Sequence, residues 1–488
     1  MFEKLEGYIK GEDWGNALIT SAILFQINNT NIELIKYYLK TLAKTKQRDL
    51  CISLSEYLRS IVDENNIEIL KDLSKVFADL EDYELAAKYL QKYVDSKPDG
   101  DVLADDYNWL GCYYNYIYNK TYDLKTLDKA IKYFKLVVEK YPTNKLYLIN
   151  LCLMYKLHNQ LDKAEPYWNK LLNAGGLTND EAFEYAICSM KNSDSKQFYK
   201  YYESRFHKTK FPVKIPNVNI PRWAGENIKN STLLIYFEQG FGDTFFVSQY
   251  LYRLKPLVKK IIFVVQDAVY TLLENNTCGI EIYPAGHTSL DSLKFDYYMP
   301  SMDIFKILNM DKKDFSQGKN IINVDKNKIE YYKKNYFDNK KIKIGVSFIG
   351  NKIGNTTRDI PLKNLKILQE KLIGYQFYIL NQEIPDKDIP AGFINLGKTF
   401  NDFEDTAAAI ENCDLILNSD NCILNLAGVL NKKTYALFNW EYEFRWFDLT
   451  GDDVVFYKSV KPFVNKKMND WENTINTVVD EIQKEYNS

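Results

Sequence analysis

The sequence has few residues of the kinds that build metal, disulfide or nucleic-acid sites. It contains only three histidines in 488 residues, and its seven cysteines are an odd number without a CxxC pair. Basic and acidic residues nearly balance at 63 and 65, which gives a formal net charge of −2. These scarcities argue against a zinc site, a disulfide framework or a basic nucleic-acid surface, and they favour reduced, mostly buried thiols.

Long apolar runs are also lacking. No stretch approaches the roughly 18 consecutive apolar residues that would suggest a membrane span. The composition, with 46% hydrophobic and 26% charged residues, is typical of a globular chain. No signal-peptide pattern follows Met1, so we expect a cytoplasmic protein. A chain of this length predicts two or three domains.

Glycine and strand patterns are scarce in residues 1–210, where apolar residues recur at helical spacing. From Ile67 onward a repeat of about 34 residues emerges, which resembles the tetratricopeptide repeat. A few extra residues near 119–125 are expected to lengthen one turn between helices. Stacked hairpins of this kind usually hold an extended peptide or a protein, and the alternative is that they only support the second half or a dimer. The small residue at one position of the second helices, Ala86, Ala130 and Ala164, is expected to let the two helices of each hairpin cross closely. Ser74, Gly111 and Cys152 belong to the first-helix pattern.

The pattern changes after a proline-containing segment. Arg222 to Gly225 predicts an ordered connector anchored by Trp223, and beyond residue 230 short apolar strands alternate with helices. The alternation restarts near Ile342. We therefore expect parallel sheets covered on both faces, with a ligand cleft opposite the carboxyl ends of the strands. The expected domains are repeats over 1–210, a connector over 211–230, and two Rossmann-like halves over 231–338 and 339–488.

The run EQGFGDT at residues 238–244 lies between a strand at 233–237 and an apolar helix. Such a strand, glycine turn and helix bring backbone N–H groups close to a ligand in nucleotide-binding domains. Gly240 and Gly242 would give the backbone room for that approach. Asp243 has a plainer explanation as the cap of the helix.

The second half resembles the two-domain, B-type (GT-B) glycosyltransferases related to heptosyltransferases, glycosyltransferase family 9. In particular it is similar to bacterial proteins that join tetratricopeptide repeats to such a domain. The resemblance implies an inverting, metal-independent enzyme without a cofactor. It would transfer sugar from a nucleotide-sugar donor to an acceptor, for which a protein hydroxyl presented by the repeats is expected. The motifs that carry it stand in the family's order: residues 238–244, 345–351, 358–362, 402–408, 414–428, 445–446 and 470–471.

The resemblance also implies roles for single residues. It places the catalytic base, or a carboxylate that orients the acceptor, at Asp243, and the helix cap remains the alternative. The neighbouring acceptor-side loop is formed by Glu238, Gln239, Gly240 and Gly242. The donor-side candidates all follow predicted strands or open a helix: Phe348, Asn351, Lys352, Arg358, Gln382, Asp420, Asn421 and Asn425.

These donor-side candidates have different expected tasks. Lys352 and Arg358 would contact the diphosphate, unless they lie on a solvated loop. The helix that opens at Asp420 and Asn421 would bind the diphosphate through backbone N–H groups, unless those residues are a simple cap. The base or ribose would be held near Phe348 and Gln382.

One departure from the family concerns the motif that its members usually write as D-T-x-x-x-H-L-A-G. Here both the threonine and the histidine are replaced, by Asn421 and Asn425. A neutral asparagine can donate a hydrogen bond to a phosphate oxygen, but it cannot carry positive charge or shuttle a proton. This leaves open a non-catalytic scaffold that binds a partner, as well as an epimerase-like enzyme on the same fold. A homo-oligomer is left open too.

Overall fold

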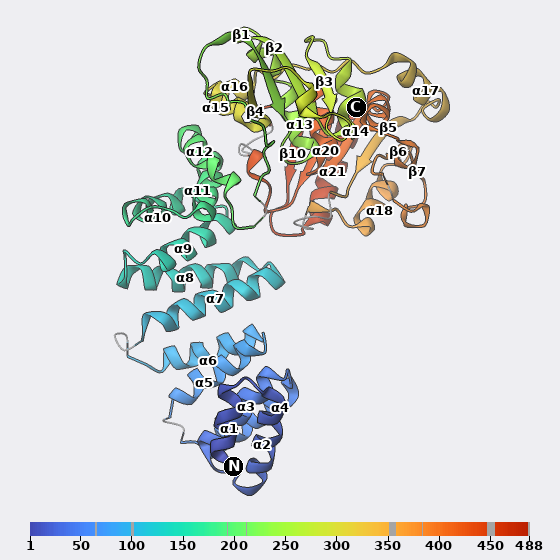
Figure 1. Ribbon diagram of the computed structural model, residues 1–488. Coiled ribbons are helices and arrows are strands. Elements are labelled where there is room, and N and C mark those ends of the chain that lie inside the picture. Colours follow the sequence, from blue (N-terminus) through green and yellow to red (C-terminus); the bar gives the residue numbers. More distant parts are fainter. Residues whose placement is uncertain are drawn as a thin grey trace. The chain divides into compact units, whose positions relative to one another are not determined.

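The chain forms two compact units, Met1–Gly176 and Leu177–Ser488. The first unit is helical, and the second contains two parallel sheets (Figure 1). No helix in the described part of the chain has both the length and the apolar character needed to span a membrane. The computed structural model describes residues 1–63, 66–98, 102–192, 194–210, 212–350, 358–382, 384–446 and 454–486.

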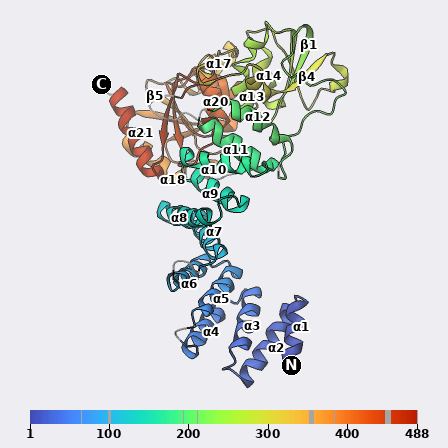
Figure 2. The ribbon, with the colours of Figure 1, turned by 90° about the vertical axis from the view of Figure 1, so that its left-hand side faces the viewer.

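The first unit is a succession of helices, coloured blue to teal in Figures 1 and 2. Most of them pack against the next helix along the chain, whereas α5 packs mainly against α3 and α6. Short polar side chains at several of their starts accept backbone N–H groups of the first turn, among them Asp13, Asn31, Asp82, Asp123 and Asn144. The helices are α1 (Phe2–Lys10), α2 (Trp14–Ile27), α3 (Ile32–Lys44), α4 (Arg48–Ile61), α5 (Glu68–Asp79), α6 (Tyr83–Asp95), α7 (Ala104–Thr121), α8 (Leu124–Lys140), α9 (Lys145–Leu157) and α10 (Leu161–Asn173).

The expected helix crossings occur at the small residues. The Ser74 hydroxyl donates to the carbonyl of Ala86 at 2.9 Å, and the Cys152 thiol donates to the carbonyl of Ala164 at 3.8 Å. The same two repeat positions therefore meet in two different helical hairpins of the first unit. At Gly111 an added Cβ would lie 2.7 Å from the Phe134 ring, so only glycine fits. The tetratricopeptide-like hairpins predicted from the sequence are confirmed.

The third hairpin corrects one expectation. The extra residues near 119–125 do not lengthen a turn, because α7 runs to Thr121 and α8 begins at Leu124. Tyr122 ends α7 in the left-handed conformation at φ +53°, and Asp123 accepts the backbone N–H groups of Lys125 and Thr126. The extra residues lengthen α7 and α8 instead, because the residue that ends α7, Tyr122, is followed directly by the N-cap of α8, Asp123.

Ion pairs join first helices that lie one repeat apart. Exposed pairs of this kind contribute little to stability, whereas the carboxylate of the third pair is buried at 1% exposure. The third pair bears on a groove described below. The pairs are Lys36–Asp72, Lys44–Asp79 and Lys71–Asp106.

The second unit opens with helices and continues into a four-stranded parallel sheet of order β3-β2-β1-β4. One face of this sheet packs on α13 and α14, while the segment around Val218 and the 3₁₀ turn η3 (Leu290–Ser292) cover the other face. The elements are α11 (Asn179–Lys191), α12 (Ser195–Tyr201), the 3₁₀ turn η1 (Tyr202–Phe206), β1 (Ile228–Tyr236), α13 (Phe241–Ser248), β2 (Val258–Val265), α14 (Asp267–Glu274), β3 (Glu281–Pro284), β4 (Tyr297–Pro300), α15 (Ile304–Ile307) and α16 (Lys312–Phe315).

A six-stranded parallel sheet of order β10-β9-β8-β5-β6-β7 follows. Helices α18 and α21 cover one face, and α19 and α20 cover the other. The sequence did not predict the two edge strands. β7 has only three residues, and β10 contains Pro462, which speaks against a strand in the sequence although an edge strand tolerates it. The elements are α17 (Lys326–Tyr336), β5 (Ile342–Ser347), α18 (Leu362–Lys371), β6 (Tyr375–Ile379), β7 (Phe393–Asn395), α19 (Phe403–Glu411), β8 (Leu415–Ser419), α20 (Cys422–Val429), β9 (Thr434–Phe438), β10 (Val460–Val464) and α21 (Trp471–Tyr486).

One apolar core runs through the second unit. It contains residues of both sheets, of α13, α19 and α20, and also of α11 and α12. Trp223 is buried in the same core, at 2% exposure, as expected for an anchored connector. The helices from 179 to 206 thus pack with the α/β part, so the border between compact units lies after Gly176, ahead of the end of the repeats expected near 210. The division into the four segments 1–210, 211–230, 231–338 and 339–488 stays a prediction.

Candidate active site

A cleft of about 470 Å³ lies in the second unit at the carboxyl ends of strands from both sheets. Residues 239–243 follow β1, Gln266 follows β2, Ile349 and Gly350 follow β5, Asn381 follows β6, 420–425 follow β8, and Glu443 and Arg445 follow β9. Parallel strands direct their connecting loops to one edge, which is why segments far apart in the sequence meet here. The cleft occupies the position that the strand pattern predicted.

Most predicted site residues line this cleft. It brings together Gln239, Gly240, Gly242, Asp243, Arg358, Asp420, Asn421 and Asn425. Three others are described but do not line it: Glu238, Phe348 and Gln382. Asn351 and Lys352 lie outside the described residues.

The three residues that miss the cleft have other partners. Glu238 is 2% exposed and accepts hydrogen bonds from Arg205 Nε at 3.0 Å and from the Met302 N–H at 2.7 Å. Phe348 is 1% exposed, in the core beneath α18 and α21. Gln382 is exposed and donates to the Phe400 carbonyl at 3.1 Å. The side chain of a residue just after a strand can point into the cleft, into the core or to solvent, and the sequence did not distinguish these directions.

The turn after β1 is strained at a residue other than glycine. Gln239 has φ +66°, whereas Gly240 has φ −88°, which any residue can adopt. The Gln239 side chain donates to the Tyr202 hydroxyl at 2.8 Å and accepts from Arg445 Nη2 at 2.7 Å. These two contacts hold the unusual backbone in place.

Gly242 serves the packing of two helices. An added Cβ would lie 2.8 Å from Asn425 Nδ2 and 3.4 Å from Cys422 Cα. Because α13 and α20 come this close, position 242 has no space for a side chain. Gly242 therefore allows close packing of α13 on α20, and the expectation that it also makes room for a ligand stays a prediction.

Asp243 contacts residues that follow strands of both sheets, Gly240 after β1 and Arg445 after β9. One carboxylate oxygen accepts the Gly240 N–H at 2.9 Å, and the other lies 2.6 Å from Arg445 Nε. Gly240 is the N-cap of α13 and Asp243 is its third residue, so Asp243 is not the cap residue expected from the sequence but accepts the N–H of that cap residue. The ion pair adds a partner from the segment after β9. Burial raises the pKa of Asp243 above its ordinary value, and the nearby Arg445 guanidinium opposes that rise.

Arg358 lies between two carboxylates, Asp420 and Glu443. Its guanidinium pairs with Glu443, and Arg358 Nε lies 3.9 Å from Asp420 Oδ2. The other oxygen of Asp420 accepts the Trp446 indole N–H at 2.8 Å. Burial raises the pKa of Asp420, and Arg358 acts against that rise.

Asn421 is the N-cap of α20. Its carbonyl oxygen accepts the Ile423 N–H at 2.9 Å and the Asn418 amide at 3.0 Å. Its own amide donates to Ser347 Oγ at 2.8 Å and to the Ile349 carbonyl at 3.2 Å. The side chain therefore ties β5 to β8 and caps α20, which is the simple-cap alternative.

Asn425 and Gly428 of α20 both contact Tyr457. The Tyr457 hydroxyl donates to Asn425 Oδ1 at 3.0 Å, and an added Cβ on Gly428 would lie 2.5 Å from the tyrosine ring. Asn425 is 8% exposed, so this polar pair is largely buried. The asparagine that replaces the family's histidine has a structural partner in this chain.

The Gly428→Ala variant is expected to lose about 1–3 kcal/mol of stability, because overpacking a buried position displaces neighbouring side chains. The measurement is urea unfolding followed by circular dichroism. Gly7→Ala in α1, where an added Cβ meets nothing within 4 Å, is the control and is expected to be neutral or stabilising. Equal stability of the Gly428→Ala variant and the unaltered chain would contradict the packing assigned to Tyr457.

No protein-family model matches the chain, and no curated protein does. Similar solved structures do exist. A glycosyltransferase of family 9 from Veillonella parvula is 11% identical over 54% of this chain and 99% of its own, with a TM-score of 0.43. The C-terminal part of a TPR repeat-containing protein from Cytophaga hutchinsonii is 17% identical over 42% of this chain and 77% of its own, with a TM-score of 0.35. PilF of Pseudomonas aeruginosa is 12% identical over 41% and 86%, with a TM-score of 0.30.

The fold class, a tetratricopeptide-like helical part followed by an α/β part with two parallel sheets, is confirmed by the observed elements.

Glu443 and Arg445 are the charged cleft residues that sequence reasoning missed, and it also missed these uncharged ones: Phe241, Gln266, Ile349, Gly350, Asn381, Cys422 and Ile423. The two charged residues follow β9 in a segment whose aromatic residues predicted core and cleft wall, and Arg445-Trp446 carried part of the family resemblance. With them, the described lining contains two guanidinium groups, Arg358 and Arg445, and three carboxylates, Asp243, Asp420 and Glu443. Each arginine is paired with a carboxylate, so an anionic ligand would have to compete for the contacts of both guanidinium groups.

Proposed function

We propose that the second unit is a glycosyltransferase that transfers sugar from a nucleotide-sugar donor, with inversion and without a metal ion. The observation that carries the proposal is the cleft, in which the turn after β1 faces the start of α20 across the carboxyl ends of two parallel sheets. Open α/β sheets bind ligands at this edge. The volume of about 470 Å³ falls in the range of small-molecule sites.

The reaction we propose is a direct displacement. Asp243 accepts the proton of the acceptor hydroxyl while that oxygen bonds to the anomeric carbon of the donor. The bond from the anomeric carbon to the diphosphate oxygen breaks, and its electron pair leaves with the diphosphate. Arg358 and the N-terminus of α20, which begins beside Asn421, stabilise the departing charge. The raised pKa of Asp243 favours its task as a base.

The acceptor we propose is a protein or peptide hydroxyl, bound by the helical unit. Tetratricopeptide-like arrays offer extended surfaces that suit such partners. This assignment concerns the partner only, and the cleft would still hold a nucleotide sugar if the acceptor were of another kind.

A second candidate function is a non-catalytic scaffold on the same fold. The observation that favours it is the use of Asn421 and Asn425 as internal contacts, together with the pairing of both described cleft arginines with carboxylates. A thermal-shift screen separates the two functions, because a ligand that binds only the native state raises the melting temperature. Stabilisation by a nucleoside diphosphate or its sugar supports the transferase, and none from any of them supports the scaffold.

Two cleft variants are expected to change nucleotide affinity in opposite directions. Arg358→Ala removes a diphosphate contact and should weaken binding about tenfold or more, as expected for the loss of a charge-assisted hydrogen bond. Glu443→Gln removes the competitor for Arg358 and should strengthen binding. The measurement is isothermal titration with the nucleoside diphosphate that gives the largest thermal shift.

Arg253→Ala is the matched control for these titrations. Arg253 is a partly buried arginine that pairs with Asp314 at 2.9 Å and does not line the cleft. Its loss should leave nucleotide affinity unchanged. Unchanged affinity in both Arg358→Ala and Glu443→Gln would place the diphosphate elsewhere.

A further inference from the structure

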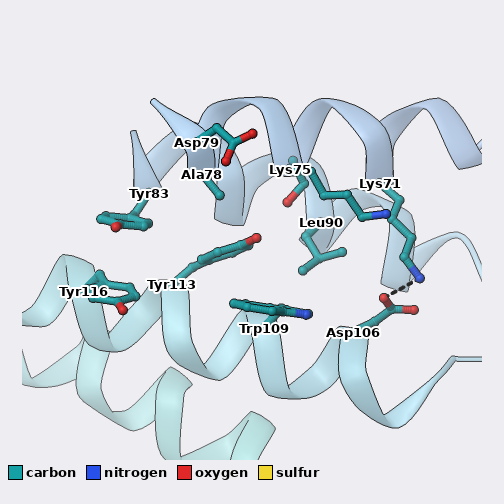
Figure 3. Close-up of a pocket in the computed structure, with 11 residues that line it drawn as sticks. Lys71, Lys75, Ala78, Asp79, Tyr83, Leu90, Asp106, Trp109, Tyr113 and Tyr116 are labelled. Atoms are coloured by element: carbon teal, nitrogen blue, oxygen red, sulfur yellow. Dashed lines mark ion pairs between the residues drawn. The ribbon is translucent and has the colours of Figure 1, made fainter. Parts of the chain in front are cut away.

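The first unit contains a groove of about 480 Å³ between the hairpin of α5 and α6 and the following helix α7. Three aromatic residues of α7, Trp109, Tyr113 and Tyr116, form one side of it (Figure 3). Their spacing of four and three residues puts them on one helical face. Tyr83 of α6 extends the row by stacking on Tyr116 at a ring distance of 4.2 Å.

The aromatic row is unusually accessible. Trp109 is 52% exposed and Tyr116 is 45% exposed, whereas Tyr113 between them is 4% exposed and forms the floor. The rings of Trp109 and Tyr113 are 6.0 Å apart and lie within 29° of parallel. Two half-exposed aromatic side chains, Trp109 and Tyr116, on either side of a buried one indicate a surface on which a ligand can stack.

Charged side chains face the aromatic row from α5, with one more from α7. Figure 3 shows Lys71 and Lys75 across the groove from Trp109, with Asp106 at the end of the row. Lys71 Nζ lies 2.6 Å from Asp106 Oδ1, while the second oxygen, Asp106 Oδ2, is buried without a hydrogen-bond partner among the described residues. Asp79, which also lines the groove, pairs with Lys44 at 2.8 Å.

The charged side chains around the groove, which we call its rim, are Lys71, Lys75, Asp79 and Asp106. Together they offer hydrogen-bond donors and acceptors with little net charge. Strongly charged ligands gain little here, because Lys71 and Asp79 already have partners of opposite sign. The negative ring faces suit a flat, weakly polar ligand face that carries polarised C–H groups. Contacts to both ammonium and carboxylate groups require a ligand that accepts and donates hydrogen bonds at its edge.

We propose that this groove is a carbohydrate-binding site for a neutral oligosaccharide. Sugar rings present C–H groups on their faces, which suit Trp109 and Tyr116, and hydroxyl groups at their edges. Those hydroxyls accept from Lys71 and Lys75 and donate to Asp106 and Asp79. The unpartnered oxygen of Asp106 gains the donor that it lacks.

A proline-rich peptide is the other ligand that fits aromatic grooves. Proline has no backbone N–H, so such a segment has little to donate to the two carboxylates. The rim therefore favours the sugar. This inference is independent of the proposed sugar transfer, because it concerns only residues of the first unit.

The test is an array of malto-, cello- and chito-oligosaccharides probed with the full-length chain, followed by isothermal titration of bound members. We expect binding, together with a change in tryptophan emission that Trp109→Ala lacks. Trp109→Ala should weaken binding about tenfold or more, since stacking on one aromatic ring is worth that much in comparable sites. Asp106→Asn should weaken it as well. Asp243→Asn in the second unit should leave it unchanged, even if sugar transfer is lost.

Tyr141→Ala is the matched control, because Tyr141 is 50% exposed at the end of α8 and does not line the groove. Its loss should leave binding intact. Circular dichroism should show the same melting for Trp109→Ala and Tyr141→Ala, since both side chains are half exposed. The inference is overturned if no oligosaccharide binds, if binding survives both groove substitutions, or if an oligoproline peptide binds through Trp109 and the sugars do not.

Discussion

Replacing Asp243 with asparagine is expected to lower the rate of sugar transfer by about 10²- to 10⁴-fold, the contribution of a general base. The asparagine keeps the size of the side chain and can still accept the Gly240 N–H. It loses the negative charge that accepts the proton and pairs with Arg445. The measurement is transfer from the nucleotide sugar identified by thermal shift, at saturating donor.

The pH dependence separates a base from a purely structural residue. Asp243 accepts a proton only when ionised, so transfer should fall as the pH decreases through its pKa. Burial raises that pKa, and the acidic limb should therefore lie above the ordinary aspartate value of about 3.9. The residual activity of Asp243→Asn should lack this limb. The same limb in both proteins would assign Asp243 to the helix cap alone.

Asp267→Asn is the control for this experiment. Asp267 also opens a helix after a strand of the first sheet, but it is exposed and does not line the cleft. Its substitution should leave transfer unchanged. A loss of transfer equal to that of Asp243→Asn would show that the effect is not specific to the cleft.

Replacing Arg205 with alanine is expected to lower the free energy of unfolding by about 3–5 kcal/mol, the cost of leaving a buried charge without its partner. Arg205 is 2% exposed and pairs with Glu238 at 3.0 Å and with Asp303 at 2.8 Å. Asp303 is also held by Arg222. The loss should be measured by urea denaturation of the full-length chain, in the transition that reports the second unit.

A double variant tests the reason for that loss. Arg205→Met together with Glu238→Gln removes two buried charges of opposite sign, and it should recover much of the stability lost in Arg205→Ala. Arg253→Ala, which breaks a partly buried pair with Asp314, should cost only about 1 kcal/mol or less. Similar losses in Arg205→Ala and Arg253→Ala would contradict a central role for the buried network.

Glu238 shows how much of the candidate site could be predicted from the sequence. Its place at the head of the glycine turn predicted an acceptor-side residue, and the turn itself does line the cleft at Gln239 and Asp243. Arg205, which turns Glu238 inward, belongs to a helical segment that the sequence grouped with the repeats. A contact between residues 33 positions apart leaves no pattern in the sequence.

Asn421 and Asn425 show the same limit. Their spacing placed them on the helix that opens the donor side, and both line the cleft. Their partners, Ser347 and Tyr457, come from distant segments, and these contacts give the two asparagines structural tasks. The departure from the family could be read from the sequence, but its physical consequence could not.

The sequence by itself determined the helical repeats, the alternation of strands and helices, and the edge at which the cleft lies. These follow from local periodicity and from the rule that parallel strands gather their loops at one edge. Only the tertiary structure decided which side chains face that cleft. It alone showed the pairing of Asp243 with Arg445, the packing role of Gly242 and the open aromatic row of α7. Such choices depend on packing between segments distant in sequence, which local patterns do not encode.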